Sequence, residues 1–217
     1  MRTGTLFTLK RLLAGQTIAR IRMNEALSRE TLRGKVVDVG GGRRPDYFDF
    51  FQQEQVTSIE AIDGSISGID FEKDALPYAE DAIDTVIICN VLEHVYHHQF
   101  LLSEVARILA PKGHIIGFVP FWVGYHPDPH DYFRYTREAI EQLLADAGFV
   151  DIRVHAVGGG PFVANYNTIV LSMPRFIRPI AYLPYVGLDR LFLAMRPRSA
   201  ERYPLGFIFS GTARSNS

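Results

Sequence analysis

The distribution of apolar residues along the chain predicts short buried strands that alternate with helices. Helical spacing of apolar residues is clear in 97–109 and 136–147, and 45–53 is read as a further helix. Apolar runs of strand length, bounded by glycine, proline or aspartate, cover 35–39, 56–62, 67–70, 85–90, 114–119, 149–157 and 206–212. Strands that alternate with helices indicate an α/β fold with a doubly wound, mostly parallel sheet covered on both faces.

The chain reads as one domain with an addition at each end of its core. Residues 1–30 are predicted to form a helical cap over a pocket, and 31–157 form the core. Residues 158–204 are irregular and punctuated by proline, so we expect an insertion there, followed by the last strand and tail in 205–217. Only six residues separate Asp63 from Asp70, which is too few for a full crossover helix. The second and third strands must therefore be joined by a turn or a shortened crossover.

Composition narrows the class of protein. The chain has 217 residues, 47% hydrophobic and 22% charged, with a formal net charge of −1. This is globular composition without the basic excess that nucleic-acid-binding domains usually carry, so no nucleic-acid partner is expected. The single cysteine, Cys89, excludes a disulfide within the chain and fits a reducing compartment.

Basic residues interrupt the N-terminal apolar stretch, and no run reaches bilayer-spanning length. A cytoplasmic protein, free or peripheral at a membrane, is expected.

Candidate ligand-binding residues follow the first two strands. Asp38 and Val39 lead directly into Gly40-Gly41-Gly42, and glycines after a strand let the backbone approach a ligand closely with its N–H groups exposed. Asp63 ends the next strand, where a carboxylate can accept hydrogen bonds from both hydroxyls of a ribose. Each feature alone also fits an ordinary turn, but together they predict a nucleoside pocket at the strand ends.

Two further candidates follow later strands. Asp70 could accept a hydrogen bond from an adenine amino group, with Phe71 as an apolar contact, although Asp74 competes for this role. Glu60 is a weaker ribose candidate than Asp63 because it lies within its strand. Asn90 directly follows the fourth strand, so we expect it to face the same crevice.

In this order, these residues resemble the class I methyltransferases that depend on S-adenosylmethionine (SAM), and most closely their type 11 small-molecule subgroup. The resemblance covers about residues 34–150. The segments that carry it are Asp38-Val39-Gly40-Gly41-Gly42, Asp63, Leu76-Pro77-Tyr78, Asp84, Val91-Leu92-Glu93-His94-Val95 and the helix and turn from Glu104 to Gly113. It implies SAM as cofactor and a Rossmann-like sheet of seven strands in the order 3-2-1-4-5-7-6, the last strand antiparallel.

The resemblance also implies residue roles. The glycine segment and Asn90 would line the methionine end of SAM, and Asp38 would help hold its amino group. Asp63 would bind the ribose, and Asp70 with Phe71 the adenine. The chain departs from the subgroup in two places: Gly41 stands where cysteine is frequent, and the usual helix after Asp63 is missing.

Two alternatives of other classes stay open. A nicotinamide-dependent oxidoreductase would need G-x-G-x-x-G, but Pro45 replaces the third glycine, even though Arg43 and Arg44 suit a phosphate. A protein could also bind SAM without catalysis, as a subunit or regulator. We expect methyl transfer to an oxygen or nitrogen of a small molecule, saccharide or lipid conjugate.

The segment 120–136 combines prolines, aromatic rings and titratable groups, and it should emerge over the crevice after the fifth strand. In the type 11 group a similar His-Asp-Tyr-x-Arg-Tyr-Thr segment lies beside the acceptor site. His130 is the predicted general base, with Asp131 as its orienter or a second candidate. The alternative for these two residues is a structural role at the entry to the next helix. The predicted acceptor contacts are Trp122, His126, Tyr132 and Arg134, although Arg134 could instead pair with Asp131.

No metal is expected. His94, His97 and His98 share a helical face, but neither a cysteine nor a well-placed carboxylate completes a site.

The segment 161–204 interleaves arginine with apolar residues. It could be a lid at a lipid surface, a dimer interface, or an insertion that packs on its own domain. Neither the acceptor nor the oligomeric state can be read from the sequence.

Overall fold

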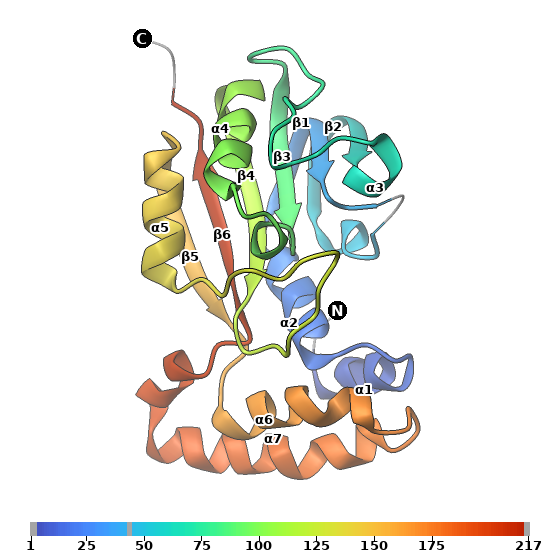
Figure 1. The fold of residues 1–217 in the computed structure, drawn as a ribbon. Coiled ribbons are helices and arrows are strands. Elements are labelled where there is room, and N and C mark those ends of the chain that lie inside the picture. Colours follow the sequence, from blue (N-terminus) through green and yellow to red (C-terminus); the bar gives the residue numbers. More distant parts are fainter. Residues whose placement is uncertain (1–3, 43–44, 215–217) are drawn as a thin grey trace.

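The predicted strands form a single mixed sheet in the computed structural model, which describes residues 4–42 and 45–214 (Figure 1). Within the described residues the sheet has six strands, in the order β2-β1-β3-β4-β6-β5. The first four strands of this order run parallel, and β6 lies antiparallel to β4 and β5. The strands are β1 (Thr31–Val39), β2 (Gln52–Ile62), β3 (Ile83–Cys89), β4 (Leu109–Pro120), β5 (Val150–Val157) and β6 (Gly206–Thr212). The doubly wound fold and the antiparallel last strand are confirmed.

The third of the seven predicted strands, at 67–70, does not form, and this prediction is wrong. The chain makes a single helical turn after β2, the helix α3 (Gly64–Ser67), in which the carbonyl oxygen of Asp63 accepts from the N–H groups of Ile66 and Ser67 at 3.0 and 2.7 Å. Gly68 follows with a φ of 71°, and 68–70 do not extend into a strand. The connection is too short to return the chain to the sheet in parallel, so β2 is left at the edge.

The prediction of a helix over 45–53 is also wrong. Only the 3₁₀ turn η1 (Phe48–Phe50) forms there, because Gln52 already pairs with Thr31 as the first residue of β2. Tyr47, Phe50 and Phe51 are buried. The segment therefore contributes aromatic packing rather than a covering helix.

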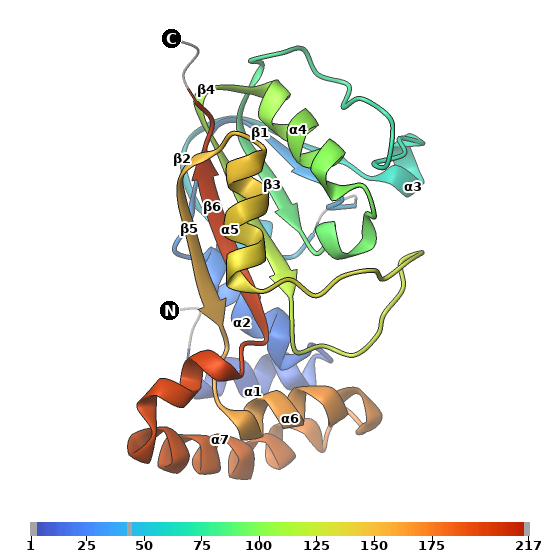
Figure 2. The same cartoon turned by 60° about the vertical axis from the view of Figure 1, so that its left-hand side comes forward.

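Helices cover both faces of the sheet. The predicted helices over 97–109 and 136–147 form as α4 (His98–Ile108) and α5 (Arg137–Asp146), and both lie on one face (Figure 2). The Thr136 hydroxyl caps α5 by accepting from the Ala139 N–H at 3.3 Å. The other face is covered by α2 (Ile18–Leu27) and the η1 segment. An apolar core therefore lies on each face of the sheet, and each strand contributes to both cores because alternate side chains point to opposite faces.

Residues 158–204, predicted to be irregular, are mostly helical. They form α6 (Pro161–Ile169), η3 (Val170–Ser172), α7 (Arg178–Met195) and η4 (Pro197–Arg202). Three of the six prolines, Pro161, Pro179 and Pro197, stand in the first turns of these helices, where proline lacks only an N–H that would be unpaired anyway. Pro184 lies in the interior of α7.

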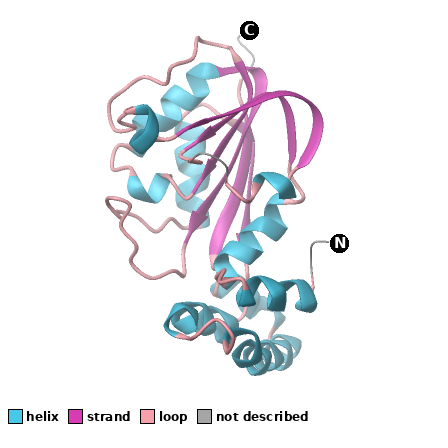
Figure 3. Ribbon diagram, turned by 90° about the vertical axis from the view of Figure 1, so that its right-hand side faces the viewer, coloured by secondary structure: helices cyan, strands magenta, loops and turns pink. Residues whose placement is uncertain are grey.

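The insertion packs on its own domain. Its apolar side chains share a core with α1 (Thr5–Leu13) and α2. This helical layer lies below one end of the sheet (Figures 1 and 3). Among the described residues, no helix is both long and apolar enough to cross a bilayer.

Candidate cofactor and acceptor site

A pocket of about 570 Å³ opens where β1, β2 and β3 end. The carboxyl ends of neighbouring parallel strands, at the point where the strand order reverses, are where ligands bind in open α/β sheets. We call this the cofactor pocket. Its lining residues are Gly40, Asp63, Gly64, Ile69, Asp70, Phe71, Glu72, Asn90, Val91, His94, Val95, Asp128, Pro129 and His130.

The glycine turn after β1 is packed too tightly for side chains. Gly40 has a φ of 82°, and its N–H donates to the carbonyl oxygen of Ile62 at 2.6 Å. A Cβ at Gly40 would come within 2.3 Å of Val91, and a Cβ at Gly41 within 1.7 Å of Asp38 Oδ2. Gly42 has a φ of 62°. The turn therefore needs glycine for close approach as well as for conformation. Arg43 and Arg44 lie outside the described residues.

Asp38 lies fully buried beneath this turn. Its Oδ2 accepts from the Tyr47 hydroxyl at 2.7 Å, while Oδ1 has no hydrogen-bond partner among the described residues. Burial raises the pKa of Asp38 to about 7, and the negative charge of Asp63 adds to the rise. Asp38, Gly41 and Gly42 are not among the residues that line the cofactor pocket, and the Asp38 carboxyl lies behind the glycine turn.

The predicted adenine and ribose residues line the same pocket. Asp63 stands at the end of β2, and Asp70 and Phe71 follow α3. The Asp70 carboxylate accepts from the Glu72 N–H at 3.0 Å and pairs with Lys73 at 3.0 Å. Its interactions are thus local to its own turn.

Asn90 joins the cofactor pocket to a second cavity. It follows β3 with a φ of 55°, and its Nδ2 contacts Met23 Sδ at 3.4 Å. The second cavity, which we call the acceptor pocket, measures about 310 Å³. It is lined by Thr17, Ala19, Arg20, Met23, Asn90, His94, Phe118, Pro120, Val123, His126 and Asp128. The predicted N-terminal cap therefore supplies one wall through α2.

The loop 121–136 is fixed against the 3₁₀ helix η2 (Leu92–His94). The N–H of Tyr132 donates to the Glu93 carbonyl oxygen at 2.8 Å, and the Tyr135 hydroxyl donates to the Leu92 carbonyl oxygen at 2.9 Å. The His126 N–H donates to Asp131 Oδ2 at 2.9 Å, and the His126 ring lies beside that of His94, with ring centroids 5.2 Å apart.

Of the other predicted loop residues, Asp131 and Arg134 bind each other, whereas His130, Trp122 and Tyr132 are exposed. Asp131 forms two hydrogen bonds with Arg134, which hold the pKa of Asp131 down to about 2, so the pairing considered for Arg134 is the one observed. His130 is exposed at the rim of the cofactor pocket. Trp122 and Tyr132 are 42% and 43% exposed and line neither pocket.

Glu93 is a candidate site residue to which the sequence alone assigns no role. This carboxyl is completely buried, and neither oxygen has a hydrogen-bond partner among the described residues. Burial raises the pKa of Glu93 to about 8. Its Oε1 lies 3.6 Å from His94 Nε2 and 4.0 Å from His126 Nε2. The signal in the sequence is an acid placed among apolar residues directly after a buried strand, a position where a charge needs a partner.

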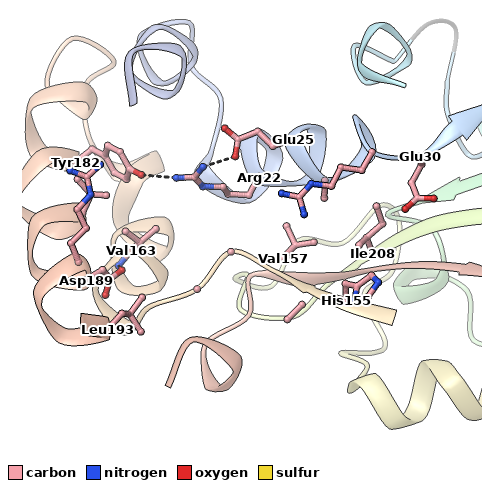
Figure 4. Close-up of a pocket in the computed structure, with 17 residues that line it drawn as sticks. Arg22, Glu25, Glu30, His155, Val157, Val163, Tyr182, Asp189, Leu193 and Ile208 are labelled. Atoms are coloured by element: carbon pink, nitrogen blue, oxygen red, sulfur yellow. Dashed lines mark hydrogen bonds and ion pairs between the residues drawn. The ribbon is translucent and has the colours of Figure 1, made fainter. Parts of the chain in front are cut away.

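A third cavity, of about 430 Å³, lies between α2, α7 and the ends of β5 and β6 (Figure 4). It shares no lining residue with the other two pockets. Within its lining, Arg22 bonds Glu25 and the Tyr182 hydroxyl (Figure 4), and Asp189 accepts from the first N–H groups of α6. None of the residues predicted to bind the cofactor or the acceptor lines this cavity.

The sheet order and the pocket at its switch point define a Rossmann-like α/β protein with its candidate ligand site at the carboxyl ends of the strands. The model of a family described as a methyltransferase domain matches residues 13–154, and the chain belongs to this family. The class I assignment is confirmed, SAM is supported as the cofactor, and the type 11 subgroup stays a prediction. The match speaks against the nicotinamide alternative.

Individual relatives agree with the family. The chain is 27% identical over 142 residues to an uncharacterized methyltransferase of Mycobacterium leprae, and the match covers 57% of this chain and 53% of that protein. It is 27% identical over 92 residues to a probable SAM-dependent methyltransferase of Mycobacterium tuberculosis, and that match covers 40% of this chain and 34% of that protein. The longer of these matches thus spans about half of the relative.

Solved structures share the fold. A chain of the complex between the Trm112 methyltransferase activator of Haloferax volcanii and a methyltransferase has 15% identity, a TM-score of 0.55 and 90% coverage of both chains. At this identity the likeness concerns the fold alone.

Proposed function

We propose that this protein transfers a methyl group from SAM to an oxygen or nitrogen of a small molecule, saccharide or lipid conjugate. The observation that carries the proposal is the junction of the two pockets. The cofactor pocket and the acceptor pocket share Asn90, His94 and Asp128. A donor in one pocket and an acceptor in the other would meet at these residues.

The residues around the glycine turn suit the parts of SAM. The buried Oδ1 of Asp38 matches the ammonium group of its amino-acid tail, and Gly40 leaves room for the backbone to approach it. Asp63 would accept from the ribose hydroxyls, and Phe71 would contact the adenine. Asn90 would lie beside the reacting end.

Catalysis would come mainly from alignment. SAM supplies a methyl group on a sulfonium, a good leaving group, so that holding the acceptor in line supplies much of the rate. His130 is the proposed proton acceptor, since it lines the cofactor pocket two residues after Asp128, which both pockets share. Trp122 and Tyr132 line neither pocket, so they would contact only a part of the acceptor that extends beyond the acceptor pocket.

Profiling with a labelled donor tests the function. Protein would be incubated with a metabolite extract and SAM labelled in its methyl group, and labelled products would be identified by mass spectrometry. We expect labelled product with the wild type and much less with His130→Ala, while SAM binding stays unchanged. SAM binding without any labelled product would favour the non-catalytic alternative, and full turnover by His130→Ala would refute the base.

We also propose that the outer face of the insertion contacts a lipid surface. Apolar side chains in and before α7 are largely exposed, with Arg175, Arg190 and Arg196 among them. The exposed apolar residues are Leu171, Phe176, Ile177, Ile180, Leu183, Leu188, Leu191 and Met195.

Liposome flotation tests this contact. The wild type should float with vesicles that contain anionic lipid, and the double variant Ile180→Glu, Leu191→Glu should not. Absence of lipid-dependent flotation, with a dimer found by light scattering, would assign the face to self-association instead.

A further inference from the structure

Three potential metal ligands meet between the cofactor and acceptor pockets. One donor atom each from Glu93, His94 and His126 lies within 4.8 Å of the other two. The two distances from Glu93 Oε1, 3.6 and 4.0 Å, are too long for hydrogen bonds. Donor atoms around a tetrahedral zinc lie about 3.4 Å apart, given bonds of about 2.0–2.1 Å. If each of the three donor atoms moved by less than about one ångström, all three could bind the same ion.

The backbone contacts of both imidazoles favour the tautomer that a metal requires. Nδ1 of His94 contacts the carbonyl oxygen of His130, and Nδ1 of His126 contacts the carbonyl oxygen of Gly124 at 2.8 Å, with Arg134 Nη2 farther away at 3.3 Å. A carbonyl oxygen can only accept, so these contacts favour a proton on each Nδ1 that is donated to the backbone. Each Nε2 then keeps a lone pair on the side facing Glu93. A ring N–H given to a backbone carbonyl is the usual outer support of a histidine that ligates metal.

The carboxyl group of Glu93 lacks the partners that its burial demands. The side chain is 0% exposed, and neither oxygen is hydrogen-bonded within the described part of the chain. Buried carboxylates are normally paired or coordinate a metal, because removing them from water is costly. The charge of Arg134 acts on Glu93, but its guanidinium forms an ion pair with Asp131 instead.

We propose that Glu93, His94 and His126 bind one divalent transition-metal ion of the zinc type. Two histidines and one carboxylate make the three-ligand set that leaves a further position open. His94 and His126 both line the acceptor pocket, so the open position faces it. This inference deepens the proposed function: the position would take an oxygen of the acceptor and lower the pKa of that group. The sequence predicts no metal, and the two histidines considered there together with His94 do not join this set: His98 contacts the Tyr135 hydroxyl, and His97 is exposed.

Metal titration of the protein without a histidine tag tests the site. After removal of metal with a chelator, ZnCl₂ would be titrated calorimetrically, and CoCl₂ would be followed by visible absorption. We expect one equivalent to bind, with affinity more than roughly tenfold lower in Glu93→Gln and in His126→Ala. His97→Ala is the matched control and should bind as the wild type does. Circular dichroism would verify that each variant is folded.

The same samples separate this inference from the proposed function. SAM would be titrated into the metal-free and the zinc-loaded protein. Failure of the wild type to bind zinc, or wild-type affinity in both Glu93→Gln and His126→Ala, overturns the metal site even if SAM binds. Zinc binding that depends on both residues supports the site even if SAM does not bind.

Discussion

At the scale of single residues, the most informative group is the Asp38 carboxyl. The sequence identifies it as a ligand candidate because it precedes the glycines. It does not reveal that the carboxyl is sealed under Gly41 and bonded to Tyr47, since this depends on how the chain folds back after the turn. That environment gives Asp38 a measurable influence on stability.

The ligand-free protein should lose stability between pH 4 and pH 7 because of Asp38. Burial raises the pKa of Asp38 from 3.8 to about 7, so the folded state holds a proton that the unfolded state releases. The stabilisation is complete below pH 4 and disappears as the pH rises through 7, a difference of about 4 kcal/mol. Urea unfolding across this range measures it. Asp38→Asn should reduce the slope without abolishing it, because burial also raises the pKa of Glu93 to about 8 and adds to the slope in this range. Equal slopes in the two proteins would contradict the account.

Gly41→Ala should destabilise the fold through sterics alone. Its Cβ would lie 1.7 Å from Asp38 Oδ2, and the surrounding structure would have to shift, at about 1–3 kcal/mol. Gly124→Ala is the matched control, because a Cβ there meets nothing within 4 Å and should change stability by less than about 0.5 kcal/mol. Thermal or urea unfolding of both variants decides, and equal stabilities would show that the turn is not tightly packed.

At the scale of elements, regular patterns are predictable and short connections are not. The helices α4 and α5 and the last strand follow from apolar spacing, the cap at Thr136 and strand-length runs. The segments 45–53 and 67–70 were predicted wrongly because pairing of β2 and the short link after Asp63 override local preference. The helices of the insertion were missed because proline in a first turn looks the same as proline in a loop.

Asp189 should stabilise the insertion by capping α6. Its carboxylate accepts from the N–H groups of Phe162 and Val163 at 3.0 and 2.8 Å, and it is 4% exposed. Asp189→Ala should lower the free energy of unfolding by about 1–3 kcal/mol, and Asp189→Asn by less, because the amide retains an acceptor. Chemical unfolding measures both. A loss that is no greater for alanine than for asparagine would argue against capping.

At the scale of the whole molecule, the site is assembled from segments that are remote in sequence. α2 walls the acceptor pocket from the N-terminal side, and the loop 121–136 brings His126 to η2. The motif order predicts the cofactor side, because strand ends in this fold meet at one edge. The contact of His126 with Glu93 and His94 depends on the path of a loop, which no periodicity encodes.

Calorimetric titration of SAM into the wild type and Asp63→Ala tests the central claim most directly. The account predicts one equivalent bound by the wild type, and binding about ten- to a hundredfold weaker without the carboxylate that would hold the ribose. Glu141→Ala, an exposed change on α5, should match the wild type. No binding by the wild type, or equal affinity in Asp63→Ala, would contradict it.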